Sequence, residues 1–246
     1  MTVLALGGCH DDIVAASRVP FRPDTSCPGV IVRRPGGVAR NVAVLLAGSG
    51  VPVRLLSRIG EDEAGDRLMD GLIAAGVDPA MVIRTGEART GSYVAIHDED
   101  GALVAAVSDL VIYDGLTPEV IAALRDDLTS AELVFADANL PADSLDALAA
   151  LLASAGRIDR LMLDAVSIAK VPRLLWPARR GARLFANRAE AGALLGTDPF
   201  DAEEAAQGLA DAGLTRAVVT DGLGPVAFWR TTRSSCWTWR RPPSWM

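Results

Sequence analysis

The sequence predicts an α/β protein whose mostly parallel sheet is flanked by helices and accompanied by a small β lid. Short apolar runs alternate with helix-like segments along most of the chain. Four of these runs end in Asp or Asn, a pattern typical of parallel strands that are buried on both faces and carry polar residues at their carboxyl ends. They lie at residues 133–137, 161–164, 183–187 and 217–221. Two β-rich runs around Asp98–Gly101 add a predicted hairpin.

The elements before this hairpin follow from their apolar periodicity. Residues 3–6 read as the first strand, and residues 13–17 and 29–34 as strands of the lid. A helix begins at Val38, with Val38, Val42 and Leu45 as its apolar stripe. A strand at 53–56 then precedes an acidic-capped helix that Gly76 closes.

The second half of the chain alternates in the same way. The hairpin at 91–107 completes the lid, and helices at 117–124 and 144–152 separate the later strands. Neither an internal repeat nor a flexible linker divides the sequence. Open α/β sheets bind ligands outside the carboxyl ends of their strands, so we expect the functional residues there.

Composition excludes several classes of function. The chain has 246 residues, half of them hydrophobic, and a net charge of −7, so it can bury one sizeable core and is not expected to bind nucleic acid. It has neither a long apolar run nor a basic N-terminal segment, and we therefore expect a cytoplasmic protein without membrane contact. The three cysteines are irregularly spaced, which indicates neither disulfides nor zinc. His10 and His97 stand alone, and each is expected to be an ordinary residue rather than a metal ligand.

The stretch PGGVARN contains two adjacent glycines directly before a predicted helix. A helix start exposes backbone N–H groups, so Gly36 and Gly37 suit an anion or a hydroxyl-rich ligand, which Asn41 could share from one turn further on. The alternative is a plain loop and cap. A Walker loop does not fit, because Lys170 is the chain's single lysine. A dinucleotide fingerprint does not fit either, since GGCHDD follows the first strand.

The segment from this loop to residue 66, PGGVARNVAVLLAGSGVPVRLLSRIGEDEAGD, resembles the first signature of the ribokinase-like (PfkB) sugar and nucleoside kinase family. The matching positions are Gly36, Gly37, Asn41, Gly50, Gly60 and Gly65. DAVS at 164–167 and NRAEAGAL at 187–194 look most like pseudouridine kinases, and the similarity covers residues 3–229. The resemblance implies a ribokinase-like fold and a small-molecule sugar or nucleoside as substrate. It leaves open a homodimer formed through the lid.

The resemblance assigns a substrate site to Asp12, Gly36, Gly37 and Asn41. Asp12 matches the family's aspartate that accepts hydrogen bonds from sugar hydroxyls, a sensible role because charge-assisted hydrogen bonds are strong. The glycines and Asn41 match the loop that lies against the sugar. Without the family, Asp12 reads equally well as an exposed turn residue. The family usually has Asn where this chain has His10.

The resemblance also implies ATP and Mg²⁺ as cofactors. Asn187 and Glu190 match the family's Asn-x-x-Glu motif, with Glu190 acting on the metal through water, as Mg²⁺ commonly allows. Thr220, Gly222 and Gly224 match a turn that contacts the nucleotide. Read without the family, Asn187 and Glu190 are a helix capping box and the glycine turn is an ordinary hairpin.

The C-terminus departs from the family. Residues 230–246 carry four arginines, no acidic residue and three of the five tryptophans. The family's Asp-Thr-x-Gly-Ala-Gly-Asp motif, which supplies the anion hole and the catalytic base, does not occur in the sequence. We therefore expect an incomplete kinase domain over residues 1–229 that lacks the C-terminal part of the fold, with an aberrant, poorly packed tail over 230–246. The tail reads either as a trimmed protein's own binding segment or, as we favour, as a reading-frame error in GC-rich coding DNA.

The sequence thus predicts ATP-dependent phosphorylation of a sugar hydroxyl, with a ribonucleoside such as pseudouridine favoured. No residue of the chain is assigned as catalytic, so this form is expected to be inactive. The alternative is a non-catalytic protein that still binds a sugar or nucleoside. A nucleotide-dependent oxidoreductase is disfavoured because the dinucleotide fingerprint does not occur.

Overall fold

The computed structural model describes residues 2–230 and 235–239, with side chains up to Trp229. The chain forms two compact units. One comprises Met1–Leu6 and Leu116–Met246, and the other comprises Gly7–Gly115. The expected kinase domain, residues 1–229, therefore extends over both units.

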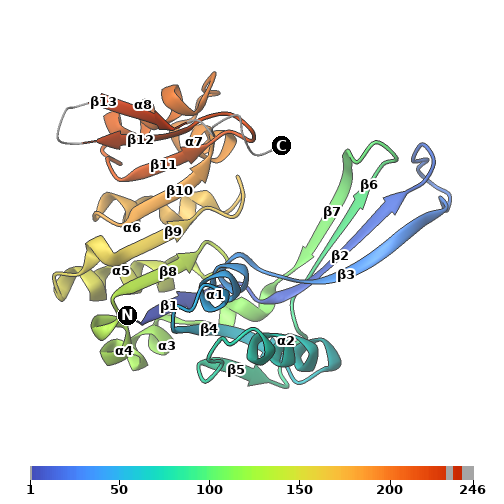
Figure 1. Ribbon diagram of the computed structural model, residues 1–246, viewed down its shortest axis with the longest axis horizontal. Helices are drawn as coiled ribbons and strands as arrows, with labels where there is room; N and C mark the ends of the chain where they lie inside the picture. Colours follow the sequence, from blue (N-terminus) through green and yellow to red (C-terminus); the bar gives the residue numbers. More distant parts are fainter. Residues whose placement is uncertain (1, 231–234, 240–246) are drawn as a thin grey trace. The chain divides into compact units, whose positions relative to one another are not determined.

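The first unit contains the predicted parallel sheet. Its parallel strands are β1 (Val3–Leu6), β8 (Leu133–Asp137), β9 (Leu161–Asp164), β10 (Arg183–Asn187) and β11 (Ala217–Thr220), side by side in that order (Figure 1). All four residues of β1 are buried, as are most of β8. The four runs ending in Asp or Asn are thus confirmed as neighbouring parallel strands.

Helices of the first unit connect these strands. They are α3 (Pro118–Ala123), α4 (Arg125–Ser130), α5 (Ala142–Ser154), α6 (Leu175–Arg179), α7 (Arg188–Leu195) and α8 (Ala202–Asp211). Leu145, Leu148 and Leu152 of α5 are fully or almost fully buried, at the three- and four-residue spacing of an amphipathic helix. The helices expected at 117–124 and 144–152 are confirmed as α3 and α5. None of the helices in the described ranges combines the length and the apolarity needed to cross a bilayer.

The C-terminal end of this sheet corrects one expectation. Strand β12 (Val226–Arg230) pairs antiparallel with β11, and β13 (Ser235–Trp239) pairs antiparallel with β12. The prediction that residues beyond Trp229 offer no strand to the sheet is therefore wrong for 235–239. Aromatic residues and threonine favour strands, and Trp237, Thr238 and Trp239 supply them without any helical period. The rest of the predicted tail after Arg230, residues 231–234 and 240–246, lies outside the described residues.

The second unit contains the lid. Strands β2 (His10–Ser17), β3 (Gly29–Gly36), β6 (Ser92–His97) and β7 (Leu103–Asp109) lie side by side as a single layer in the order β3-β2-β6-β7 (Figure 1). β2 and β6 are parallel, and the outer pairs are antiparallel. This confirms the predicted lid, including the hairpin around Asp98–Gly101.

The second unit also holds two parallel strands and two helices. β4 (Val53–Gly60) pairs with β5 (Val82–Thr85), while α1 (Val38–Gly48) and α2 (Glu63–Ala74) occupy the predicted helical positions. The predicted apolar stripe of α1 is wrong in its face. Ala39 and Ala43 are its buried residues, whereas Leu45 is 71% exposed. Small side chains let a helix approach its neighbour closely, so alanines rather than the larger residues form the packing face.

Candidate functional site

Asp12 and Gly36 lie against each other in the second unit. Asp12 belongs to β2 and pairs with Arg34 of β3, two residues before Gly36. A Cβ added at Gly36 would lie only 2.3–2.4 Å from the carboxyl atoms of Asp12. Any side chain at position 36 would therefore displace the carboxylate. The structure thus brings together two of the four residues expected to bind substrate.

Gly37 fixes the start of α1 against the loop after β1. It has φ +96°, and a Cβ there would lie 2.1 Å from the carbonyl oxygen of Gly8. The Arg40 N–H donates to the same Gly8 oxygen at 3.1 Å, so one of the helix-start donors is already used within the chain. Gly37 places no side chain over the helix start, and no side chain caps it.

Asn41 lies one turn into α1 and is exposed. Its side-chain oxygen accepts a hydrogen bond from Nη1 of Arg40 at 3.0 Å. The glycines and Asp12 are therefore held close together, while Asn41 is engaged by its neighbour.

His10 is the residue of this site that the sequence analysis missed. Its ring is almost fully buried, with Nε2 3.3 Å from Oδ1 of Asp12 and Nδ1 3.0 Å from the hydroxyl oxygen of Tyr113. The Cys9 N–H donates to that hydroxyl oxygen at 2.7 Å. His10 does not stand alone as expected, because its ring contacts the carboxylate expected to bind substrate. The sequence signals for it were its place two residues before Asp12 and the Asn that the family usually has at this position.

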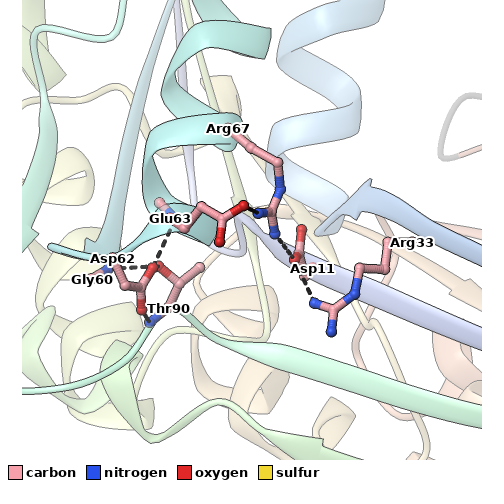
Figure 2. Close-up of polar contacts among 8 residues, drawn as sticks. Asp11, Arg33, Gly60, Asp62, Glu63, Arg67 and Thr90 are labelled. Atoms are coloured by element: carbon pink, nitrogen blue, oxygen red, sulfur yellow. Dashed lines mark hydrogen bonds and ion pairs between the residues drawn. The ribbon is translucent and has the colours of Figure 1, made fainter.

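Asp11 takes a structural role on the opposite face of β2. Neighbouring residues of a strand point to opposite faces, so Asp11 and Asp12 serve different surroundings. The buried carboxylate of Asp11 binds Nη2 of Arg67 at 2.8 Å and Nη1 of Arg33 at 3.5 Å, and Arg67 also binds Glu63 at 2.9 Å (Figure 2). These four side chains line a hollow of about 770 Å³. The two carboxylates and the two guanidinium groups have equal and opposite charge, so these four side chains are neutral together.

Asp62 joins the beginning of α2 to the loop before β6. Its carboxylate accepts from the N–H of Gly65 at 2.8 Å and from both the N–H and the hydroxyl of Thr90, at 2.8 and 2.6 Å (Figure 2). Thr90 in turn accepts from the N–H of Gly60 at 2.9 Å. Burial raises the pKa of Asp62, but hydrogen bonds from Thr90 and Gly65 outweigh it and leave the pKa below its ordinary value. Gly60, Asp62 and Gly65 of the family signature therefore have a structural role, because their hydrogen bonds hold the beginning of α2 to the loop before β6.

In the first unit, Asn187 and Glu190 form a complete capping box at the start of α7. The Glu190 N–H donates to Oδ1 of Asn187 at 2.9 Å, and the Asn187 N–H donates to Oε2 of Glu190 at 2.8 Å. The capping box, which the sequence analysis gives as the alternative for this pair, is thus present. Asn187 also pairs with Thr220 across β10 and β11, so two residues of the expected nucleotide site are direct neighbours.

The glycine turn after Thr220 is a hairpin between β11 and β12. The Gly224 N–H donates to the carbonyl oxygen of Asp221 at 2.7 Å, and Gly222 has φ +54°. Nε of Arg188 lies 3.3 Å from Oδ1 of Asp221 and ties the turn to α7. The hairpin alternative is therefore realised too, directly beside Asn187.

Three carboxylates lie at the same end of the sheet: Asp137 ends β8, Asp164 ends β9, and Glu190 lies in the first turn of α7 after β10. Burial, opposed by a hydrogen bond from the Val166 N–H and assisted by the charges of Asp137 and Glu190, raises the pKa of Asp164 to about 6. Within the described ranges no three His, Cys, Asp or Glu side chains are close enough to ligate a metal directly. The concentrated negative charge fits a hydrated cation such as Mg²⁺.

The loop after Asp164 is strained. Val166 has φ +62°, and the Ser167 N–H donates to the carbonyl oxygen of Ala165 at 2.6 Å, which makes a γ-turn centred on Val166. Left-handed backbone is unfavourable for a β-branched residue. Such strain is commonly found at functional sites.

Replacing Asp164 by Asn should stabilise the protein at neutral and alkaline pH. The folded-state pKa of about 6 lies above the ordinary value of 3.8, so folding favours the protonated acid. That favourable contribution is present below about pH 4 and is lost as the pH rises through 6. At about pH 8 the Asp164→Asn variant should unfold with about 2–3 kcal/mol more free energy than the wild type.

Urea titrations near pH 8 and pH 5 test this expectation. The advantage of the variant should shrink at the lower pH, and Asp159→Asn, a change at an exposed position of the same unit, should shift stability little at either pH. An advantage that does not depend on pH would contradict the role of ionisation.

A second hollow, of about 680 Å³, lies along β10, β11 and β12. Phe185, Val218 and Phe228 are neighbours across these strands and are only half buried. None of the expected site residues lines this hollow. Its lining combines aromatic and apolar side chains with Arg183 and Arg216.

Comparisons with known proteins agree with these observations. A family model described as pfkB family carbohydrate kinase matches residues 2–241. The pseudouridine kinase of Escherichia coli strain K12 is 30% identical over 241 residues, which is 96% of this chain and 75% of that protein. The uncharacterized sugar kinase YeiI of the same strain is 36% identical over 143 residues, 58% of this chain and 40% of that protein. The chain thus spans less than half of YeiI.

The same fold is found in solved structures of other proteins. Arabidopsis thaliana ribokinase complexed with ribose and ATP superposes with a TM-score of 0.75 at 20% identity, over 100% of this chain and 79% of that one. At this identity the likeness supports the fold and carries no residue roles.

Proposed function

Because the chain belongs to the pfkB family of carbohydrate kinases, we propose that its fold serves the ATP-dependent transfer of a phosphoryl group to a sugar hydroxyl of a ribonucleoside, with pseudouridine favoured. The observation that carries the proposal is the contact between Asp12 and Gly36, where a side chain at position 36 would collide with the carboxylate. The pseudouridine preference rests on the similarity to a pseudouridine kinase over almost the whole chain.

The proposed substrate clamp consists of Asp12, Gly36, Gly37 and Asn41 in the second unit. An ionised carboxylate can accept hydrogen bonds from two vicinal hydroxyls, and such bonds to a charged acceptor are strong. The glycines contribute by leaving space, since neither carries a side chain that would cover Asp12. Asn41 would bind the sugar by exchanging its contact with Arg40 for one to the ligand.

The proposed nucleotide site consists of Asn187, Glu190, Thr220, Gly222 and Gly224 in the first unit. One carboxylate oxygen of Glu190 holds the start of α7, and the other would hold Mg²⁺ through water. The bound ion would reduce the charge of the nucleotide phosphates. Thr220 and the glycine turn would contact the phosphates and ribose beside Asn187. ATP is the nucleotide bound by the structurally similar Arabidopsis ribokinase.

This 246-residue form is proposed to bind its ligands without turning them over. The sequence holds no Asp-Thr-x-Gly-Ala-Gly-Asp motif, which in the family supplies the anion hole and the base. This observation also favours the second candidate, a non-catalytic protein that binds a sugar or nucleoside. Calorimetric binding of pseudouridine, other nucleosides and free sugars tests the clamp, and a coupled kinase assay separates the two candidates. The reading-frame hypothesis adds a third arm, in which the downstream DNA is searched for an in-frame Gly-Ala-Gly-Asp.

We further propose a homodimer formed through the lid. Val30, Ile31 and Val32 are consecutive and all exposed, so both faces of β3 present apolar surface. β7 does the same with Leu103, Val104 and Val107. Exposed apolar side chains grouped along a strand are typical of an interaction site.

Charged substitutions in the lid should convert the dimer to a monomer. Ile31 is 72% exposed and Val107 is 70% exposed, so replacing both by Glu adds charge without disturbing a core. Leu45 of α1, 71% exposed in the same unit, supplies the matched control Leu45→Glu. In sedimentation velocity, the lid variant should be monomeric and the control dimeric. A monomeric wild type would contradict this assembly.

A further inference from the structure

His10 stands in a chain of polar groups that ends at Asp12. The order is Cys9 N–H, Tyr113 hydroxyl, His10 ring and Asp12 carboxylate, with separations of 2.7, 3.0 and 3.3 Å. The His10 side chain is 9% exposed, and the ring planes of His10 and Tyr113 are inclined at 54°. Tyr113 comes from the far end of the second unit's sequence, so the contact is built by the fold.

The hydrogen inventory of this chain indicates the direction of each bond. A tyrosine hydroxyl has one proton and can also accept, and its oxygen already accepts from the Cys9 N–H. Its proton can then be donated to Nδ1 of His10. In neutral imidazole one nitrogen accepts and the other carries hydrogen, so Nε2–H faces Oδ1 of Asp12.

We propose that His10 is a positioning residue that holds the Asp12 carboxylate ready for the vicinal hydroxyls of the sugar. The inference rests on the proposed function of Asp12 as the substrate clamp. Nε2 lies 3.3 Å from Oδ1 and attracts it through its N–H, while a side chain at position 36 would take the space in which the carboxylate lies. The Asp12 side chain is still 35% exposed, which leaves an edge for a ligand.

A carboxylate that is already oriented binds more tightly than one that must be ordered by its ligand. Immobilising a side chain on binding weakens affinity, and removing this cost is the general benefit of preorganisation. The Tyr113 hydroxyl donates to Nδ1 of His10 and so places the ring hydrogen on Nε2. Nε2–H then orients the Asp12 carboxylate, which makes the contact with substrate. The tyrosine and the histidine therefore act as one pair.

Nitrogen NMR of the ligand-free protein tests the relay directly. The chain has two histidines, so ¹⁵N-histidine labelling gives two rings, which a His97→Asn variant assigns. Near pH 8 we expect the Nε2–H tautomer for His10. Asp12→Asn and Tyr113→Phe should each shift the His10 ring nitrogens and leave those of His97 in place. An Nδ1–H tautomer, or no response to Asp12→Asn, would overturn the proposal.

A double-mutant cycle with pseudouridine as the probe tests the consequence for binding. His10→Leu should weaken binding about 3- to 10-fold in calorimetry. His10→Gln, whose amide keeps a donor, should recover most of the loss. In an Asp12→Asn background, His10→Leu should add less than about 2-fold, because the two residues act through one contact. An equal loss in both backgrounds would show that His10 does not act through Asp12.

The two experiments separate failure of the inference from failure of the proposed function. If the wild type binds no pseudouridine, the proposed substrate is wrong. The ring-nitrogen measurement needs no ligand, so it still confirms or contradicts the contact between His10 and Asp12. It also covers the case in which His10→Leu does not fold.

Discussion

No phosphoryl transfer is expected from the 246-residue chain in a coupled assay with ATP, Mg²⁺ and a panel of sugars and nucleosides. Phosphoryl transfer depends on positioning and on charge stabilisation, and here candidates exist for the acceptor and part of the nucleotide site only. A general base is commonly worth about 10² to 10⁴ in rate, and one anion-hole donor about 10² to 10³. Without both, turnover should fall below detection.

The matched control is a chain that carries the family's Gly-Ala-Gly-Asp, obtained by repairing the reading frame where the downstream DNA encodes it. It should phosphorylate at least one member of the panel, while the 246-residue form binds the same substrate without product. Robust turnover by the 246-residue form would contradict the inference and would mean that another residue acts as base. Asp164 would then be examined first, since its pKa of about 6 suits proton transfer near neutral pH.

Removal of the Asp12 carboxylate should abolish most ligand binding. Losing one partner of a hydrogen bond to a charged group costs about 1.5–3 kcal/mol, which corresponds to roughly 10- to 150-fold in the dissociation constant. Calorimetry with pseudouridine should therefore show Asp12→Ala near or below the detection limit. Asp12→Asn should lose less affinity than Asp12→Ala and remain measurable, because its amide oxygen still accepts a hydrogen bond although the charge is lost.

Asp70→Ala serves as the control for this experiment, since it removes an exposed carboxylate from α2 in the same unit. It should bind as the wild type does. Circular dichroism should show all variants folded. Equal binding by Asp12→Ala and the wild type would show that this carboxylate is not a ligand.

The strands of the sheet could be predicted from the sequence because their signal is local. The four runs at 133–137, 161–164, 183–187 and 217–221 are mostly apolar and end in a polar residue, and each forms a parallel strand at the predicted place. The packing face of α1 could not be predicted in this way. Apolar periodicity favours Leu45 over Ala43, whereas close packing selects the smaller residue. The strand Ser235–Trp239 was missed because it depends on pairing with β12, which no local pattern of the sequence indicates.

In the candidate site, too, the residues with a local sequence signal could be predicted and the contacts made by folding could not. Asp12 and the glycine pair match a family signature that is visible in the order of the residues alone. The contact between His10 and Tyr113 joins residues 103 positions apart, and no local pattern indicates it. The sequence allows Asn187 and Glu190 to be either a helix capping box or part of a nucleotide site. The hydrogen bonds of the structure show the capping box. A role in nucleotide binding is tested only by a bound nucleotide.

Lys170 gives the molecule an unusual chemical property. It is the single lysine of the chain, and its Nζ donates a hydrogen bond to Oδ1 of Asn139, a buried residue of the first unit. Burial lowers its pKa below the ordinary value for lysine, against the charge of Asp137. The neutral amine is the nucleophile that attacks amine-reactive reagents, so this side chain is the one internal position at which they can attach. A fluorophore or crosslinker introduced by amine chemistry would thus mark the neighbourhood of Asn139, without any engineered cysteine.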